Sequence, residues 1–209
     1  MELLASALEA RGMPVFLISF PRYESFFGKL VAQFLNGDFG SVNQVDPHLS
    51  APLYAGDRLE AKPELEAALA AGKIILADRY IGSNLAHQSE RVPAGKRDEF
   101  LAWLKHLEYD LYGLPAEDLV IYLRVPVLDA HRLVGLKAAR SYTTLRRDIL
   151  EADIAHLEQT AIAYEQLSTE PNWVRIECAD SISGDLYSTQ EIHRAVLGAV
   201  ESRFLLRAP

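Results

Sequence analysis

The chain has 209 residues, of which 49% are hydrophobic, and this length and composition suit one domain with a sizeable core. The formal net charge of −8 argues against a general nucleic-acid or anionic-membrane surface, because such surfaces need an excess of Lys and Arg. The single cysteine, Cys178, excludes an internal disulfide, and the sequence shows no signal-peptide pattern and no apolar run near the roughly 20 residues that cross a bilayer. We therefore expect a single cytoplasmic domain over residues 1–209, with no nucleic-acid or membrane partner.

In the first part of the chain, predicted helices alternate with short strands. Apolar residues at helical spacing open the sequence and end at Gly12, and an apolar run stopped by Pro21 predicts a buried strand. Pro63 is expected to break a later helical region. The predicted elements are a helix over 1–11, a strand over 15–20, a helix over 26–35 closed by Asn36-Gly37, a helix over 65–71 and a strand over 74–78.

The second part of the chain continues the alternation. The segment 118–125 is apolar enough for a strand that is covered on both faces. The predicted elements are a helix over 96–112, that strand, a helix over 127–135, a long helix over 149–167, a strand over 173–176 and a helix over 189–204. Strands that alternate with helices predict an α/β fold with a parallel sheet and right-handed crossovers.

The tripeptide Asp78-Arg79-Tyr80 follows the predicted strand over 74–78. It therefore stands at the carboxyl end of a strand, where open α/β sheets bind ligands. Arg22 follows another strand in the same way, and both guanidinium groups suit bidentate contact with phosphate. Asp78 suits Mg²⁺ held through water. The alternative is that Asp78 and Arg79 form a structural ion pair at the sheet edge.

Tyr54 and Arg58 are four residues apart in a predicted helix and share one of its faces. A planar base is expected to stack on Tyr54 while Arg58 donates to its edge. The alternative is that Tyr54 is a half-buried core aromatic and Arg58 a solvated charge.

A basic cluster lies between two predicted helices, in a segment of about 136–148 that suits a mobile lid over phosphates. The alternative is a solvated charged face. The histidines lack metal-ligand spacing, no nucleophile elbow supports a serine hydrolase, and the 209 residues contain no G-x-x-x-x-G-K-S/T phosphate loop. The cluster consists of Lys137, Arg140, Arg146 and Arg147.

These motifs, in this order, resemble the thymidylate kinase (dTMP kinase) family over nearly the whole chain. The resemblance implies a P-loop-kinase-like three-layer sandwich with a parallel sheet, transfer of the γ-phosphoryl group of ATP to dTMP with Mg²⁺, and a homodimer. The motifs are Phe20-Pro21-Arg22, Tyr54-x-x-x-Arg58, Asp78-Arg79-Tyr80 followed by Ser83-Asn84, the Leu-Val-Ile-Tyr-Leu strand before Val125-Pro126, and the arginine-bearing lid.

The resemblance also implies roles for individual residues, which fall into an acceptor set and a donor set. In the acceptor set, Arg22 and Arg79 hold the monophosphate, and Phe20 contacts the nucleotide. Around the base, Tyr54 stacks on thymine, Arg58 bonds a thymine carbonyl, and Ser83 and Asn84 line the pocket. His87 stands where relatives often carry a tyrosine that crowds the ribose 2′ position. In the donor set, Asp78 helps to organise Mg²⁺, Lys137 and Arg140 bind ATP, and Arg140, Arg146 and Arg147 approach the transferring phosphoryl group.

The sequence departs from the family at its N-terminus, where the first strand and the phosphate loop are missing and Met1–Leu4 match later turns of the helix after that loop. In the family that strand lies in the middle of the sheet, so its loss would uncover apolar residues on both neighbours. We therefore expect a shortened form of a longer chain, which binds dTMP better than ATP and turns over negligibly. The alternatives are a non-catalytic nucleotide-binding or scaffold protein and a kinase for another nucleoside monophosphate.

Overall fold

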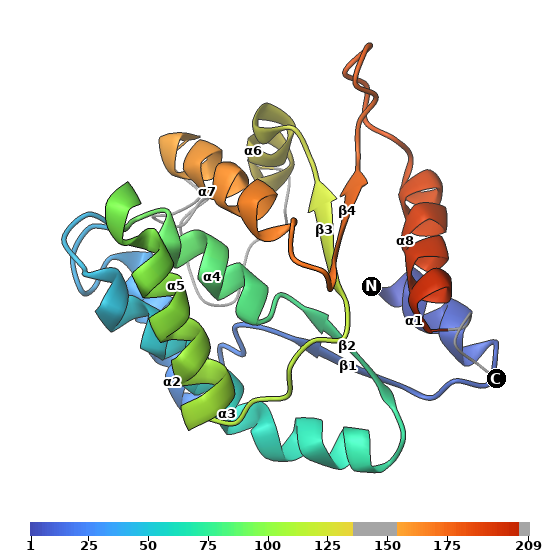
Figure 1. Cartoon of the computed structure of the whole chain (residues 1–209), viewed down its shortest axis with the longest axis horizontal. Helices are drawn as coiled ribbons and strands as arrows, with labels where there is room; N and C mark the ends of the chain where they lie inside the picture. The colour runs from blue at the N-terminus through green and yellow to red at the C-terminus, as the bar shows by residue number, and fades with distance from the viewer. Residues whose placement is uncertain (136–153, 205–209) are drawn as a thin grey trace.

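The computed structural model describes residues 1–135 and 154–204, in which short strands are surrounded by helices (Figure 1). A 3₁₀ turn, Ala94–Lys96, precedes the helix Arg97–Lys105, and a π-helical turn, His106–Leu111, follows that helix. The elements are α1 Glu2–Glu9, β1 Val15–Ser19, α2 Phe26–Asn36, α3 Pro47–Ala70, β2 Ile74–Asp78, α4 Ile81–Ser89, α5 Arg97–Lys105, β3 Val120–Arg124, α6 Val127–Gly135, α7 Ile154–Leu167, β4 Trp173–Glu177 and α8 Thr189–Phe204.

The strands pair in parallel, as predicted. β1 lies beside β2 with Val15 opposite Ile74, and β3 lies beside β4 with Val120 opposite Trp173. Within the described residues, however, they form two separate pairs and not one sheet. Each of the four strands therefore has one edge without a strand partner in this part of the chain (Figure 1).

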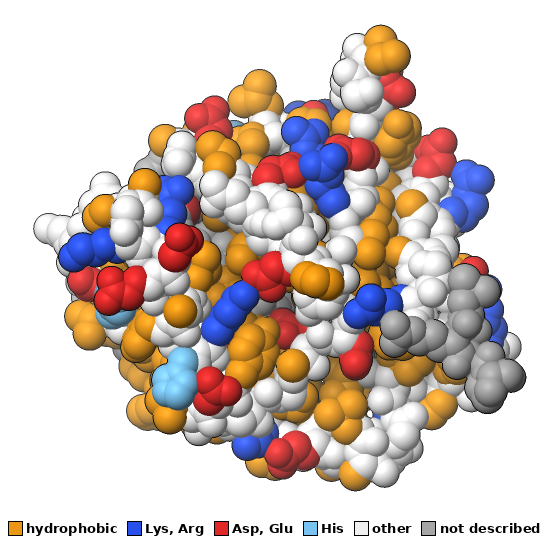
Figure 2. All heavy atoms as spheres, viewed as in Figure 1, with side chains coloured by type: hydrophobic (Ala, Val, Ile, Leu, Met, Phe, Trp, Pro, Cys, Tyr) orange, Lys and Arg blue, Asp and Glu red, His pale blue; other side chains and the backbone are white. Residues whose placement is uncertain are grey.

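The prediction that the strand over 118–125 is covered on both faces is wrong. The strand in the structure, β3, is shorter than the predicted one, and its Leu123 side chain is 46% exposed. Leu17 on β1 is 43% exposed as well. Helices α1 and α8 cover one face, where Leu4, Leu8 and Val200 pack against residues of both strand pairs, but the carboxyl ends of the strands remain open. On the face shown in Figure 2, hydrophobic side chains accordingly appear between charged side chains of both signs.

The largest core lies between α4, α5 and α7 and is closed by β4. Ile81, Phe100 and Leu104 are fully buried there, and Trp173 packs beside them. Gly82 allows α4 to approach β4 closely, because a Cβ at this position would lie 2.9 Å from the Trp173 ring. This core fixes the first turn of α4 against the strands and so positions the residues that follow β2.

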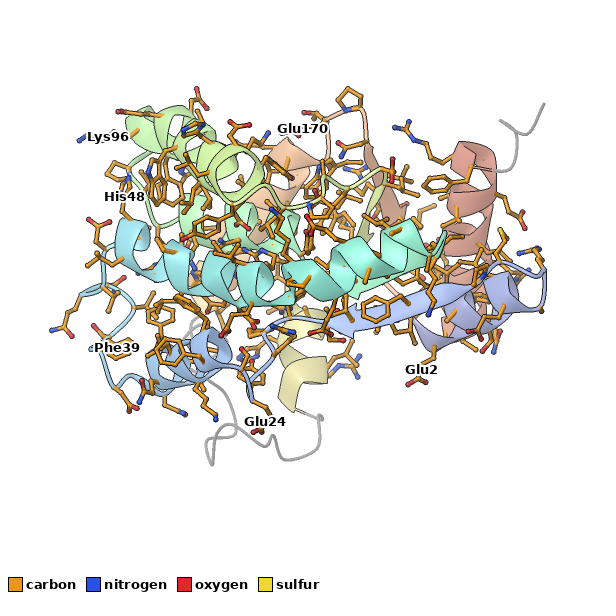
Figure 3. All side chains as sticks on the ribbon, turned by 90° about the horizontal axis from the view of Figure 1, so that it is seen from below. Glu2, Glu24, Phe39, His48, Lys96 and Glu170 are labelled. Atoms are coloured by element: carbon orange, nitrogen blue, oxygen red, sulfur yellow. The ribbon has the colours of Figure 1, made fainter. Side chains whose placement is uncertain are left out.

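Helix α3 is continuous through Pro63, so the predicted break is wrong. Proline removes one backbone donor from a helix interior, but buried Ala61, Leu65 and Ala68 hold α3 against its neighbours on both sides of this position. In Figure 3, α3 crosses most of the width of the view, with His48 at its N-terminal end. The His48 ring lies 4.8 Å from the ring of Trp103 on α5, centroid to centroid, and this contact ties the two helices together.

Helix α4 was not among the predicted elements, although it carries several predicted site residues. Gly82, Ser83 and Asn84 are weak helix formers, and burial of Ile81 and Leu85 in the core outweighs that preference. The basic cluster and the start of the long helix predicted over 149–167 lie outside the described residues. None of the helices described here is long and apolar enough to cross a membrane.

Candidate functional site

The candidate site lies at the carboxyl ends of β1 and β2 and along α4 (Figure 1). Phe20 is 6% exposed, and its ring lies 5.8 Å from that of Tyr80, centroid to centroid. The Phe20 backbone N–H donates to the carbonyl of Asp78 at 3.0 Å, which continues the pairing of the two strands one residue beyond the end of β1. The two predicted phosphate-binding segments are thus held side by side.

Arg79 has φ +62° and is the one non-glycine residue with a positive φ in the described part of the chain. This left-handed conformation costs of the order of 1–2 kcal/mol for a residue with a side chain, and such strain is concentrated at functional sites. The residue is exposed, and no ion pair joins it to Asp78 or to any other described carboxylate, so the structural ion-pair alternative is not found. Desolvation opposes its charge, but Tyr164, Tyr54 and Asp78 outweigh this and raise the pKa of Arg79.

Arg22 is engaged by carboxylates. Its backbone N–H donates to Asp57 Oδ2 at 2.7 Å, its Nε to Asp57 Oδ1 at 3.3 Å and its Nη1 to Glu64 Oε1 at 2.9 Å. Asp57 is 1% exposed and also accepts a hydrogen bond from the Ser25 hydroxyl at 2.8 Å. This arrangement fixes the loop after β1 against α3, and a phosphate would have to compete with Asp57 and Glu64 for Arg22.

Arg58, Glu108 and Asn84 form a buried polar network. Arg58 donates from Nε and Nη2 to the two carboxylate oxygens of Glu108, both at 2.6 Å, and the two side chains are 3% and 0% exposed. Burial opposes the charge on Arg58, but the Glu108 carboxylate raises its pKa above the ordinary value. Arg58 is therefore not the solvated charge of the alternative interpretation. Within the described residues, its Nη1 has no hydrogen bond.

Asn84 has a buried acceptor without a partner. Its Nδ2 donates to Glu108 Oε1 at 2.8 Å and to the carbonyl of Ala51 at 3.1 Å, which fixes the amide orientation. Its Oδ1 is the one buried side-chain polar atom without a hydrogen bond in the described part of the chain. Such an atom costs about 1–3 kcal/mol, so an N–H donor from a ligand would be favoured at this point.

The Tyr54 ring meets the ring of Phe34 edge-on, with centroids 6.4 Å apart. This contact fits the core-aromatic alternative, and base stacking on Tyr54 stays a prediction.

On α4, the Ser83 hydroxyl lies 2.9 Å from the Tyr164 hydroxyl of α7, and the Tyr164 ring stacks on Tyr122 at 5.0 Å. Ser83 is thus held by α7, since its partner Tyr164 lies 81 positions later in the sequence.

Asp78 is exposed, and its carboxylate makes no hydrogen bond or ion pair within the described residues. No group of three or more His, Cys, Asp or Glu side chains able to hold a metal occurs in residues 1–135 and 154–204. One free carboxylate nevertheless fits Mg²⁺, which keeps several waters and takes other ligands from the substrate phosphates. Lys137, Arg140, Arg146 and Arg147 lie outside the described residues.

Sequence reasoning missed the partners that organise these side chains. Asp57 could have been noticed, because it directly precedes Arg58 in the helix that faces Arg22. Nothing in the sequence pattern singles out Glu108, which is 50 positions from Arg58. His156 and Tyr164 belong to a helix that was predicted, but their contacts with α4 depend on packing across more than 60 positions.

The chain resembles known proteins in sequence and in fold. A family profile described as thymidylate kinase matches residues 1–184. Thymidylate kinase from Mycobacterium tuberculosis is 28% identical over 170 residues, which are 81% of this chain and 78% of that protein. Probable thymidylate kinase from Thermococcus gammatolerans is 29% identical over 209 residues, which are 98% of this chain and 89% of that protein.

A solved structure of thymidylate kinase from Candida albicans has a TM-score of 0.67 and 16% identity, and the match covers 96% of this chain and 85% of that one. This likeness supports the α/β fold. None of these comparisons tests whether the native chain is longer, and that expectation stays a prediction. The family profile covers most of the chain, including every candidate acceptor residue described above, and the chain therefore belongs to the thymidylate kinase family.

Proposed function

We propose that the protein is a dTMP kinase, which transfers the γ-phosphoryl group of ATP to dTMP and forms dTDP. Membership of the thymidylate kinase family supports the reaction class. The observation that carries the choice of acceptor is the unpartnered Oδ1 of buried Asn84. Thymine offers an N3–H donor for this atom, and the adjacent carbonyl of the base suits the remaining Nη1 donor of Arg58.

This arrangement selects between bases by hydrogen-bond polarity. Thymine and uracil both present N3–H, whereas N3 of cytosine is an acceptor and would face Asn84 Oδ1 without a proton between them. A site built to pair with a substrate N–H rejects an analogue that lacks it, because its own buried polar groups are then left unpaired. The network around Glu108 keeps the Asn84 amide from rotating to suit cytosine.

The acceptor phosphate is assigned to Arg79, which is exposed and has no carboxylate partner within the described residues. Its left-handed backbone turns the chain sharply between β2 and α4. Phosphoryl transfer depends on positioning and on charge stabilisation, both of which a fixed guanidinium supplies. When bound, Mg²⁺ neutralises charge on the phosphate oxygens, and Asp78 would hold it through water.

We assign Lys137, Arg140, Arg146 and Arg147 to the donor side of the site, in a lid over about 136–148. We also propose that the active form is a homodimer.

The test is calorimetric titration of the chain with dTMP, dUMP and dCMP. We expect dTMP and dUMP to bind at least tenfold more tightly than dCMP, and Asn84→Ala to reduce this preference to about threefold or less. Asn43→Ala, on an exposed loop, is the matched control and should leave the preference unchanged. Equal affinity of the unchanged protein for dTMP and dCMP would refute the assignment of Asn84.

A second candidate is a nucleotide-binding protein without kinase activity, which the absence of a phosphate-loop motif from the 209 residues favours. This candidate predicts that the chain binds dTMP but forms negligible dTDP with ATP and Mg²⁺, so binding and turnover must be measured separately. A comparison of dTMP, dUMP, UMP and AMP as acceptors tests the third possibility, a kinase for another nucleoside monophosphate. dTDP formation at an ordinary kinase rate would exclude the non-catalytic candidate.

A further inference from the structure

The first turn of α4 is held by a segment that is distant in the sequence. The first backbone N–H groups of a helix have no partner inside it and need one from outside. Tyr80, the N-cap residue of α4, makes no capping hydrogen bond with its side chain within the described residues. The backbone N–H of Gly82, in that first turn, donates to the carboxylate of Glu117. A negative charge is favoured at this end of a helix, so Glu117 caps α4 from another part of the fold.

The Glu117 side chain is itself held in place. Oη of Tyr109 donates to Oε2 of Glu117 at 2.7 Å, and Nδ2 of Asn172 donates to the backbone carbonyl of Glu117 at 3.0 Å. Burial raises the pKa of Glu117 above its ordinary value, although the Tyr109 hydroxyl and the Gly82 N–H favour the ionised form. Such a half-buried, hydrogen-bonded carboxylate differs from a solvated surface charge, because its position is fixed by its partners.

A second contact joins the same segment, residues 112–119, to the turn after β2. Oη of Tyr80 donates to the carbonyl of Pro115 at 3.1 Å. The segment therefore contacts two residues that come directly after Arg79, Tyr80 through its side chain and Gly82 through its backbone. A left-handed backbone such as that of Arg79, with φ +62°, persists only where the surrounding structure determines it. These two contacts supply that support on one side of Arg79.

The site residues near this turn differ in how they are supported. The Asn84 amide is held by Glu108, and the Ser83 hydroxyl is held by Tyr164. The Arg79 guanidinium has no ion pair with a carboxylate in the described part of the chain, so its direction depends on the backbone that carries it. Loss of the cap should therefore disturb Arg79 more than the residues proposed for the base.

We infer that Glu117 is a positioning residue for the acceptor phosphate, because it holds the first turn of α4 and thereby the backbone that directs Arg79. This inference rests on the proposed function, in which Arg79 binds the monophosphate. Glu117 acts through Arg79 and touches no substrate atom. It therefore sets how much the phosphate group contributes to affinity and leaves the contribution of the base unchanged.

The test is calorimetric titration with dTMP and with thymidine, which lacks the phosphate. The ratio of the two affinities measures what the phosphate contributes. We expect the unchanged protein to bind dTMP more tightly by about tenfold or more, and Glu117→Ala to reduce this ratio to about threefold or less. Thymidine affinity should stay the same in that variant. A merely structural role of Glu117 would lower both affinities together and keep their ratio.

Two conservative variants separate the length of the side chain from its charge. Glu117→Gln should keep the ratio, because its amide oxygen accepts from Gly82 and its amide nitrogen donates to the Tyr109 hydroxyl. Glu117→Asp should lose most of the ratio, because the shorter side chain cannot reach both partners although it keeps the charge. Asp118→Ala removes the neighbouring exposed carboxylate, is the matched control and should behave as the unchanged protein does.

The outcomes distinguish this inference from the proposed function. If Glu117→Ala fails to fold, the Gln and Asp variants decide the question. An unchanged ratio in Glu117→Ala, or a ratio that Glu117→Asp keeps as well as Glu117→Gln does, overturns the inference alone. If the unchanged protein binds dTMP no more tightly than thymidine, the assignment of the phosphate to Arg79 fails, and this inference fails with it.

Discussion

Removal of the buried Glu108 carboxylate is expected to destabilise the fold strongly. The carboxylate accepts two hydrogen bonds of 2.6 Å from Arg58 and one of 2.8 Å from Asn84, and it is fully buried. In Glu108→Ala the Asn84 amide keeps its bond to Ala51, but the Arg58 guanidinium is left as an uncompensated buried charge. Breaking such a pair costs about 3–5 kcal/mol, which is a large part of a total stability of about 5–15 kcal/mol. Glu108→Gln should fall between, because its amide retains one acceptor oxygen.

Urea titration followed by circular dichroism measures this cost as a shift in the unfolding midpoint. Glu99→Ala, at an exposed position of α5, is the matched control and should change stability by no more than about 0.5 kcal/mol. The double variant Arg58→Met/Glu108→Leu should recover most of the loss, because no unpaired charge is then buried. A loss below about 1 kcal/mol in Glu108→Ala would refute the argument, since it would mean that water reaches Arg58 freely.

Three further predictions concern backbone strain, pH and packing. Arg79→Gly should be more stable than Arg79→Ala by about 1 kcal/mol, because only glycine relieves the φ of +62°, while both variants lose dTMP affinity; equal melting temperatures would contradict the strain. Burial, Arg79 and His156 hold the pKa of His87 well below its ordinary value of 6.5, so the unfolded chain takes up this proton first as the pH falls. The free energy of unfolding should therefore decrease from pH 7 toward pH 5, by up to about 1.4 kcal/mol per pH unit for this group, and urea titrations should show a shallower decrease in His87→Leu. An identical pH slope in that variant would show that other groups are responsible. Gly28→Ala should cost about 3 kcal/mol or more, because its Cβ would lie 1.8 Å from the Arg22 carbonyl oxygen, whereas Gly95→Ala, with no atom within 4 Å, should change stability by less than about 1 kcal/mol; similar melting curves for the two would be inconsistent with the packing around α2. The titratable and charged groups that face His87 are Arg79, His156 and Tyr164, and Glu90 contacts His156 on its far side.

Local signals predicted most of the elements. Gly37 ends α2 in the left-handed conformation, as its position after Asn36 suggested, and Ser25 caps the start of that helix. Pro63 misled the prediction because a propensity acts over a few residues, whereas α3 is held along its length by packing. Helix α4 was missed for the same reason: its weak helix formers predict no helix, but packing of its buried residues stabilises one.

The site was predictable only in part. Residues that directly follow strands, such as Arg79 and Asp78, could be found because the strand end itself fixes their place. The partners of Arg58 and His87 could not be found, because they lie 50 and 69 positions away and depend on how the helices pack. Sequence reasoning thus identified the groups expected to touch a ligand better than the groups that decide whether they are available to it. Arg22, bound by Asp57 and Glu64, is the clearest example.

The divided sheet has a consequence for the behaviour of the chain in solution. One edge of every strand, including β3, carries backbone N–H and C=O groups that have no strand partner within the described residues. Such edges pair readily with strands of other molecules, above all where exposed leucines such as Leu123 stand beside them. Self-association should therefore rise steeply with protein concentration, and an extended peptide that fits one of these edges should act as a solubiliser.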